Sequence, residues 1–228
     1  MEQLFKNVNI NGEICDILCR DTKIEKIGKI DGEGIDFKGK RVYAGLVDIH
    51  THGMGGIDTM DAELDKLSEL YAKSGTTTVY PTTMTAPHDD IVKVLTYPIH
   101  QNGAKIFGIH LEGPYISENR KGAQNSEYIR LPDINEFKDY PMAKIITVAP
   151  ELEGAAEYIK NTDMLVCVGH TDADYETVIK AADVGAKCVT HTFNAMLPLH
   201  HREPSVVGAA FDKDMYVQVI CDGKHIHP

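Results

Sequence analysis

The sequence contains no apolar run of about 18 residues, the length that a membrane-spanning helix needs, so we expect no membrane contact. The first residues, MEQLFKNVNINGEICD, are partly acidic and have no apolar core, which is not typical of a secretory signal. The chain also lacks an internal repeat and a low-complexity tract. A hydrophobic content of 43% with 25% charged residues is typical of a globular domain with a real core.

A CxxC pair is missing as well, although the chain has five cysteines. Cys15 and Cys19 lie four positions apart, but no second pair matches them in a zinc site. Cys167, Cys188 and Cys221 each lie inside an apolar run, so we predict that they are small core residues. Cysteines of this spacing and setting indicate a reducing, cytoplasmic location.

Positive charge is scarce. Lys and Arg number 23 against 34 Asp and Glu, which gives a formal net charge of −11. A nucleic-acid partner would require a basic surface, so none is expected. An anionic small molecule would have to be bound by a local cationic pocket, against the field of the whole chain.

Two patterns divide the chain. Residues 1–41 hold short alternating segments around Asn11-Gly12, a hairpin signal, and predict a small antiparallel β unit. Residues 42–228 alternate apolar strands with amphipathic helices, which predicts a parallel α/β sheet and favours a TIM-type (β/α)8 barrel. The expected strands are 42–49, 77–82, 105–111, 144–149, 164–169, 186–190 and 215–221, and the expected helices are 62–73, 88–100, 154–160 and 175–184.

The strand count falls short of a closed barrel. Such a barrel has eight strands and typically about 250 residues, whereas this chain has 228 residues and ends at Pro228 after the seventh expected strand. We therefore expect a barrel that lacks its eighth strand, in the front part of a longer protein.

Polar side chains follow the carboxyl ends of these expected strands, where the site of such a barrel lies. They are His50 and His52 after the first strand, Glu112 after the third, His170 after the fifth, His191 after the sixth, and Asp222 and His225 after the seventh. Imidazole and carboxylate groups that converge at one face suit zinc or iron(II), with a coordination position left open for water.

Each of these residues has an ordinary structural explanation when taken alone. A position on the surface in a glycine-rich turn explains His50 and His52. A structural anchor before Pro114 explains Glu112. His170 is adequate as a neighbour of a helix N-cap. Five such residues at the ends of the barrel strands favour a metal site over independent structural roles.

The motifs LEGPYISENRKGAQN, VGHTDADYE, THTFNAMLPLHHREPSVVGA and VICDGKHIHP resemble those of the N-acetylglucosamine-6-phosphate deacetylases, a family of the amidohydrolase superfamily. The resemblance runs from about Gly45 to Pro228, and THxFNAM followed by REP is quite specific to that family. It implies a barrel with a small β-sandwich built from both chain ends. Residues 1–41 would form the N-terminal part of that sandwich.

The resemblance also assigns residues by position. Glu112, His170 and His191 match the main metal ligands, and His50 and His52 match a pair that only some members keep, so one or two ions are implied. The positions that contact substrate are matched by Ala123, Gln124, Asn194, Ala195, Arg202 and His225. Some members carry histidine in place of Gln124; Asn194 and Ala195 match residues at the sugar phosphate, and Arg202 a phosphate-binding arginine. A surface salt bridge to Glu203 and a turn-forming role are the alternatives for Arg202 and Asn194.

The implied reaction hydrolyses the acetamide of N-acetylglucosamine 6-phosphate to glucosamine 6-phosphate and acetate, in a protein whose relatives are commonly homodimers. A divalent metal, zinc or iron, would polarise the carbonyl and activate water. In this superfamily an aspartate at the end of strand eight activates the water and then protonates the amine. No residue here matches it, and we expect it beyond Pro228; Asp222 is not assigned that role. Weak metal binding and poor turnover are therefore expected of this chain.

Two other functions stay open at this stage. A cyclic-amide hydrolase of the same superfamily usually has a carboxylated lysine on strand four, but Lys144 lies at the wrong end of that strand and Glu112 occupies the bridging place. A non-catalytic module that binds metal or sugar phosphate would retain binding without hydrolysis.

Overall fold

The computed structural model describes residues 1–100 and 102–227. The chain divides into two compact units, Met1–Gly45 and Leu46–Pro228. In the smaller unit, β1 (Glu2–Ile10) and β2 (Glu13–Arg20) form an antiparallel hairpin, β3 (Lys23–Gly28) pairs with β2, and β4 (Ile35–Asp36) runs parallel to β1. Asn11 and Gly12 in the hairpin turn have φ of 52° and 98°, as a two-residue turn of this kind requires.

A buried carboxylate joins the strands of the smaller unit. Asp16 accepts hydrogen bonds from the backbone N–H groups of Asn7 and Ile30 and from the Lys6 ammonium, at 2.9–3.0 Å. The bonds from Ile30, Asn7 and Lys6 lower the pKa of Asp16 to about 2. Val8 and Ile17 pack as buried side chains in the same unit.

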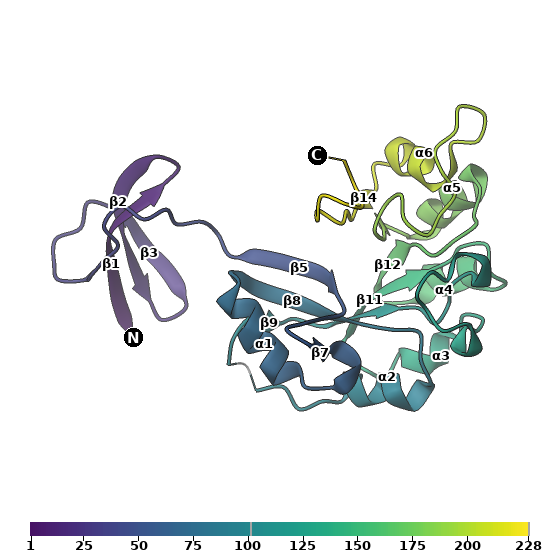
Figure 1. Ribbon diagram of the computed structural model, residues 1–228, viewed down its shortest axis with the longest axis horizontal. Helices are drawn as coiled ribbons and strands as arrows, with labels where there is room; N and C mark the ends of the chain where they lie inside the picture. The colour runs from purple at the N-terminus through teal and green to yellow at the C-terminus, as the bar shows by residue number, and fades with distance from the viewer. Residues whose placement is uncertain (101, 228) are drawn as a thin grey trace. The chain divides into compact units, whose positions relative to one another are not determined.

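A parallel sheet organises the larger unit. Its strands are β5 (Leu46–Thr51), β8 (Thr76–Thr83), β9 (Lys105–Ile106), β10 (Ile109–Glu112), β11 (Ala143–Val148), β12 (Leu165–Val168), β13 (Cys188–Val189) and β14 (Tyr216–Val217). They pair in the order β14-β13-β12-β11-β10-β8-β5, with β9 beside β8, and every pairing is parallel. Figure 1 shows the sheet curled like part of a barrel. A short hairpin, β6 (Gly53–Met54) with β7 (Ile57–Asp58), follows β5.

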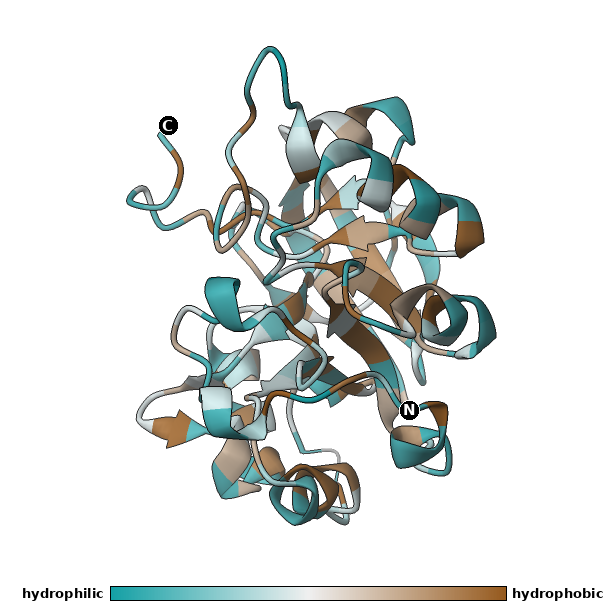
Figure 2. Cartoon of the chain, turned by 90° about the vertical axis from the view of Figure 1, so that its right-hand side faces the viewer, coloured by the Kyte–Doolittle hydropathy of each residue, from teal (hydrophilic) through white to brown (hydrophobic). Residues whose placement is uncertain are grey.

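Helices cover the outer side of the curl (Figure 1). They are α1 (Leu64–Lys73), α2 (His88–Leu95), α3 (Ile134–Phe137), α4 (Ala155–Asn161), α5 (Tyr175–Val184) and α6 (Ser205–Asp212), with 3₁₀ turns η1 (Thr59–Asp61), η2 (Glu118–Arg120) and η3 (Ser126–Tyr128). In α1, Leu64, Leu67 and Tyr71 recur on one face and are buried. Figure 2 shows the hydrophobic strands of this unit inside helices that turn hydrophilic residues outward.

The core of this unit lies on both faces of the sheet. A large cluster packs between the strands and the helices. A small cluster of Ile145, Cys167 and Cys188 is flanked by Ile49 and Tyr80. The prediction that Cys221 is a core residue is wrong, because its side chain is exposed in the segment after β14.

The alternation predicted from the sequence is confirmed at the level of a curled, parallel α/β half-barrel. Each expected strand range contains observed strand residues, although the third is divided into β9 and β10 at Phe107 and Gly108. Among the described residues, the end strands β5 and β14 each pair on one side only. Leu46, Val47, Tyr216 and Val217 on these strands are accordingly exposed.

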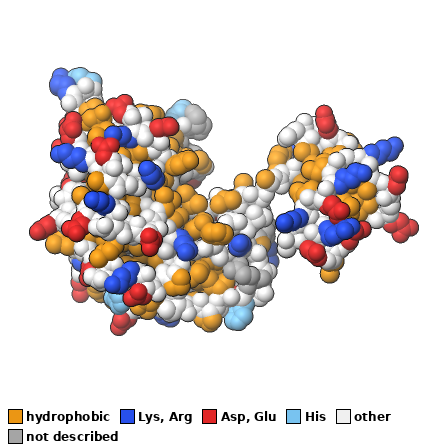
Figure 3. Space-filling model, turned by 180° about the vertical axis from the view of Figure 1, so that it is seen from behind, with side chains coloured by type: hydrophobic (Ala, Val, Ile, Leu, Met, Phe, Trp, Pro, Cys, Tyr) orange, Lys and Arg blue, Asp and Glu red, His pale blue; other side chains and the backbone are white. Residues whose placement is uncertain are grey.

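Charged side chains of both signs lie on the surface of the larger unit. Figure 3 shows acidic and basic side chains interspersed on the face of the larger unit that it presents. Within residues 1–100 and 102–227, none of the helices combines the length and the apolar character that crossing a membrane would take.

Candidate metal centre

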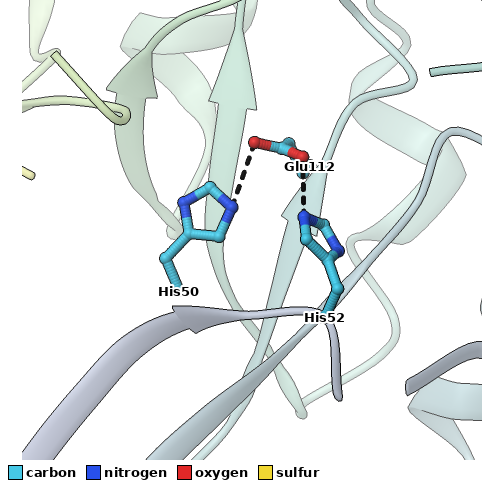
Figure 4. Close-up of side chains that lie close together, drawn as sticks. All are labelled: His50, His52 and Glu112. Atoms are coloured by element: carbon cyan, nitrogen blue, oxygen red, sulfur yellow. Dashed lines mark ion pairs between the residues drawn. The ribbon is translucent and has the colours of Figure 1, made fainter. Parts of the chain in front are cut away.

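Two histidines at the end of one strand face a single carboxylate. His50 is the last but one residue of β5 and His52 is the first residue after it, and both side chains turn toward Glu112. Glu112 is the last residue of β10. The Nε2 atom of His50 lies 3.0 Å from Oε1 of Glu112, and that of His52 lies 3.0 Å from Oε2 (Figure 4). The two imidazoles thus approach different oxygens of one carboxylate.

Two further histidines approach the same carboxylate, both at the oxygen Oε1. His170 and His191 follow β12 and β13, and their Nε2 atoms lie 3.3 Å and 3.1 Å from Oε1 of Glu112. The two Nε2 atoms are 3.0 Å apart. Both residues have a positive φ, 48° and 26°, a conformation that is rare outside glycine and that often marks functional sites.

Main-chain carbonyl groups orient two of these rings. Nδ1 of His170 lies 2.8 Å from the carbonyl oxygen of Arg120, and Nδ1 of His52 lies 3.1 Å from that of Thr82. A carbonyl oxygen only accepts hydrogen bonds, so Nδ1 carries the proton in the neutral ring and donates it. If an ion were bound, Nε2 of each ring would be left to offer its lone pair as a ligand.

The donors fit a divalent ion. Nδ1 of His191 is buried and has no hydrogen-bond partner among the described residues. Two groups bring their ligand atoms within 4.8 Å of one another, Glu112 with His170 and His191, and Glu112 with His50 and His52. An ion bound by either group would be held by one carboxylate and two imidazoles, a donor set that suits zinc or iron(II). We name these groups the inner triad and the β5 triad.

Electrostatics keeps the carboxylate charged. Burial raises the pKa of Glu112, which is 2% exposed, but hydrogen bonding with His170, His191, His50 and His52 outweighs burial and holds that pKa well below its ordinary value. Burial lowers the pKa of His52, yet its contact with Glu112 outweighs burial and leaves that pKa raised. Ionised Glu112 therefore supplies the negative charge that a cation bound there would need.

His110 packs beside the centre as a neutral ring. Burial lowers the pKa of His110 to about 3. Its Nδ1 donates to the carbonyl oxygen of Ile49 at 3.0 Å, and its Nε2 accepts from the hydroxyl of Thr147 at 2.8 Å. Its ring centroid is 4.7 Å from that of His50. Both ring nitrogens are occupied, so His110 supports the site without offering a ligand atom.

A cavity of about 650 Å³ opens over the carboxylate, within the usual size of small-molecule sites. Of the residues predicted to contact substrate, Ala123, Gln124 and His225 line it. Nε2 of Gln124 donates to Oε2 of Glu112 at 2.6 Å, and its Oε1 accepts from the backbone N–H of Thr85 at 2.6 Å. Gln124 thus fixes the orientation of the Glu112 carboxylate in this structure.

Asn194, Ala195 and Arg202 are not among the residues that line the cavity. Asn194 donates from Nδ2 to the carbonyl oxygen of His191 at 3.2 Å, and Ala195 accepts at its carbonyl from the N–H of Thr171 at 3.1 Å. Arg202 is exposed, with a guanidinium nitrogen 2.9 Å from Nε2 of His201. The first two residues therefore hold the turn that carries His191.

Asp222 and His225 form a pair at the end of the chain. Nδ1 of His225 lies 2.8 Å from Oδ2 of Asp222, and the backbone N–H groups of His225 and Lys224 donate to Oδ1 at 2.9 Å and 2.8 Å. These hydrogen bonds lower the pKa of Asp222 to about 2. Asp222 is not among the residues that line the cavity.

The sequence reasoning missed the groups that orient the imidazoles. These are the carbonyl groups of Arg120 and Thr82 and the side chain of Gln218, whose Oε1 lies 2.9 Å from Nδ1 of His50. Backbone carbonyls leave no mark in a sequence. Gln218 could have been found from the sequence, because it is a polar residue inside the apolar run VQVIC.

Known proteins resemble this chain along most of its length. No protein-family model matches it. The N-acetylglucosamine-6-phosphate deacetylase of Bacillus subtilis is 41% identical over 204 residues, which cover 81% of this chain and 52% of the relative. The crystal structure of the Pasteurella multocida enzyme of that name superposes with a TM-score of 0.88 at 29% identity, covering 99% of this chain and 66% of that one.

A second crystal structure extends the match. The N-acetyl-D-glucosamine-6-phosphate deacetylase of Mycobacterium smegmatis superposes with a TM-score of 0.78 at 30% identity, and covers 100% of this chain and 71% of that one. This chain spans about half the length of the Bacillus subtilis relative, 52%. Identity of this degree, together with the same fold, shows that the chain belongs to the N-acetylglucosamine-6-phosphate deacetylase family of amidohydrolases.

Proposed function

We propose that the protein removes the acetyl group from N-acetylglucosamine 6-phosphate, a small amino-sugar phosphate, and releases glucosamine 6-phosphate and acetate. The observation that carries this proposal is the convergence of four imidazoles on the buried Glu112 carboxylate. The deacetylase names of the relatives supply the substrate class.

Glu112, His170 and His191 are the proposed ligands of one divalent ion, and His50 and His52 with Glu112 those of a second. Nitrogen and carboxylate donors suit zinc or iron(II). Such an ion supplies Lewis acidity, which polarises an amide carbonyl and makes water nucleophilic near neutral pH. The chain's own part is to hold Glu112 ionised and to keep the lone pairs of the ring nitrogens aimed at the centre.

The remaining residues are proposed to position the sugar phosphate. Ala123, Gln124 and His225 are supported by their place in the cavity wall. For Asn194, Ala195 and Arg202 the support is their match to the family motifs, and the exposed guanidinium of Arg202 has the planar geometry that suits a phosphate group.

The finer architecture is also a proposal. We propose that the Leu46–Pro228 unit, expected as 42–228, is part of a TIM-type barrel, and that the Met1–Gly45 unit, expected as 1–41, is part of a β-sandwich; strand order and the two units support this. Free cysteines support a reducing cytoplasmic location. A homodimer stays a prediction of the family resemblance.

A cyclic-amide hydrolase is not favoured. Lys144 is exposed near the start of β11, far along the strand from its carboxyl end, and does not line the cavity. Glu112 lies among the imidazoles where a bridging carboxylate is needed. A non-catalytic sugar-phosphate module has no observation in its favour beyond those that support the deacetylase.

The experiment that tests the proposal measures acetate release from N-acetylglucosamine 6-phosphate by the protein reconstituted with zinc or iron(II). We expect slow release from this chain, because the activating aspartate is expected beyond Pro228. That release should stop when a chelator is added and should not occur with Glu112→Gln. N-acetylglucosamine without phosphate, N-acetylgalactosamine 6-phosphate and dihydrouracil serve as comparison substrates. Hydrolysis of dihydrouracil alone would overturn the proposal in favour of a cyclic-amide hydrolase.

Binding of the sugar phosphate is measured in parallel by calorimetry. Tight binding with no acetate release under any metal condition, also after the chain is extended to include the aspartate expected beyond Pro228, would assign the protein to the binding modules instead. An Arg202→Ala variant that raises KM for the phosphorylated substrate and leaves kcat nearly unchanged would support the phosphate role of this residue.

A further inference from the structure

Cys167 and Cys188 lie opposite each other on neighbouring strands. Cys167 on β12 pairs in register with Cys188 on β13, and the two strands run parallel. Neighbouring strands of a sheet lie about 4.8 Å apart, and the α-carbons that a disulfide joins lie about 4.4–6.8 Å apart. The separation that the sheet imposes on these two residues is therefore one that a disulfide bond can span.

Both side chains point to the same face of the sheet, where they pack with Ile145 in one small buried cluster. Nε2 of Gln218 donates to Sγ of Cys167 at 3.6 Å and to Sγ of Cys188 at 3.7 Å, so one amide group contacts both sulfur atoms. The thiol of Cys167 also donates a hydrogen bond to Cys188. Two free thiols are thus in direct contact.

The hydrogen bond between the thiols makes them unequal. It raises the pKa of Cys167, which burial raises further, and it lowers the pKa of Cys188. The thiolate, rather than the thiol, is the nucleophile that attacks an oxidant. Cys188 is therefore the sulfur that reacts first, and Cys167 is the neutral thiol beside it.

A cavity gives small molecules a route to Cys188. Although Cys188 is only 2% exposed, it lines a cavity of about 400 Å³ together with Leu165, Tyr216 and other residues. Cys167 is 0% exposed and is not among the residues that line this cavity. A thiol of lowered pKa next to a second thiol that can resolve its oxidised form is the arrangement of a redox-sensitive pair.

We propose that Cys167 and Cys188 are a reversible modification site, at which a hydroperoxide converts the two thiols to a disulfide that joins β12 to β13. Hydrogen peroxide first transfers an oxygen atom to Sγ of Cys188, so that the O–O bond breaks, a sulfenic acid forms and one water leaves. Sγ of Cys167 then attacks Sγ of Cys188, the S–O bond breaks and a second water leaves. The two thiols lose two electrons and two protons in total, and the peroxide is reduced to two waters.

The proposal is independent of the proposed function, because neither sulfur belongs to the inner triad or the β5 triad. Reaction with a small thiol reverses the modification. The chain also contains a comparison pair that should not form a disulfide. Cys15 and Cys19 lie four positions apart on β2, which places their α-carbons roughly 13 Å from each other, too far for the bond.

Peptide mapping after oxidation tests the proposal. The folded protein is treated with hydrogen peroxide in the presence of a chelator, catalase removes the excess, and iodoacetamide in denaturant blocks the remaining thiols. Trypsin cleaves after Lys160, Lys180, Lys187 and Arg202, so the two cysteines fall on separate peptides, 161–180 and 188–202. We expect these two peptides to be linked, and to separate when dithiothreitol is added.

Single variants test the order of the two steps. In Cys167→Ser the sulfenic acid at Cys188 has no thiol to resolve it, so dimedone should label Cys188. In Cys188→Ser, Cys167 should stay a thiol after the same treatment. Alanine variants carry the same test if the serine variants do not fold. Cys221→Ser is the matched control, because it removes an exposed thiol and should leave the link between the two peptides unchanged.

Two outcomes in the wild type would overturn the proposal. The first is recovery of peptides 161–180 and 188–202 unlinked, with both cysteines blocked by iodoacetamide, after the exposed Cys221 has been oxidised. The second is oxidation of Cys188 to a sulfinic acid while Cys167 remains a thiol, because the second sulfur would then be out of reach of the first.

Discussion

The two triads share the Glu112 carboxylate but are held together differently. His170 and His191 lie just beyond β12 and β13, and both have left-handed backbone. His50 lies in β5, an end strand that is paired on one side only, and His52 follows the last residue of that strand. The inner triad is thus fixed by left-handed backbone after two internal strands, and the β5 triad by contacts at an end strand.

Burial follows the same division. The side chains of His170 and His191 are 6% and 12% exposed, against 15% for His50 and 34% for His52. A less exposed ligand loses less bound water when it binds an ion, and solvent competes less with it for that ion. We therefore expect the inner triad to bind the first ion and the β5 triad the second.

The largest effect is expected from Glu112→Gln, which removes the group common to both triads. The variant keeps the shape but loses the charge, so four imidazoles would surround a neutral amide. Zinc affinity should fall at both triads by more than the roughly 100-fold upper range for an orienting group. Calorimetric titration measures it, and an ion still bound tightly at either triad would contradict the shared role of Glu112.

The comparison between triads is tested by His170→Ala against His52→Ala. The first should abolish tight binding of the first ion, and the second should remove only the second equivalent. Elemental analysis after dialysis against a fixed free-zinc concentration gives the bound ions per chain. The same loss in both variants would mean that the two triads do not differ in affinity.

A smaller effect is expected from Gln124→Leu. This change removes the hydrogen bond to Oε2 of Glu112, the oxygen that His52 approaches. The carboxylate becomes free to rotate, so zinc affinity should fall by about 10-fold, toward the low end for an orienting group. Gln124→Glu would place a second negative charge there and raise the pKa of Glu112, which makes it the contrasting variant in the same titration.

The smallest effect is a pH dependence of the metal-free protein. The pKa of His52 is raised above its ordinary value of 6.5, so protonated His52 stabilises the fold below pH 6.5. That stabilisation is lost as the pH rises through the raised pKa. Melting temperatures in chelator should therefore decline over this window and do so less in His52→Ala.

The sequence predicted what depends on periodicity. Parallel strands bring their carboxyl ends to one edge, so polar residues at those ends were expected to meet, and His50 and His52 were expected on one face because strands have a period of two. Tyr175–Val184 was predicted with its observed bounds. In the structure its N-cap is Asp174, and Gly185 follows its last residue.

What depends on irregular backbone was not predictable. The helix Ser205–Asp212 was missed because SVVGAAFD has almost no polar face and begins directly after a loop. The turn that places the Arg120 carbonyl on His170 has no periodic pattern at all. Cys221 was misplaced because the apolar run around it suggested a longer seventh strand, whereas β14 ends at Val217.

The left-handed backbone at His170 and His191 has a consequence for the stability of the empty protein. A β-carbon in that conformation costs on the order of 1–2 kcal/mol, and glycine avoids the cost. A His170→Gly variant should therefore melt at a higher temperature than His170→Ala when no metal is present. The left-handed backbone at His170 and His191 would then lower the stability of the fold while it holds the two imidazoles in the orientation that faces Glu112.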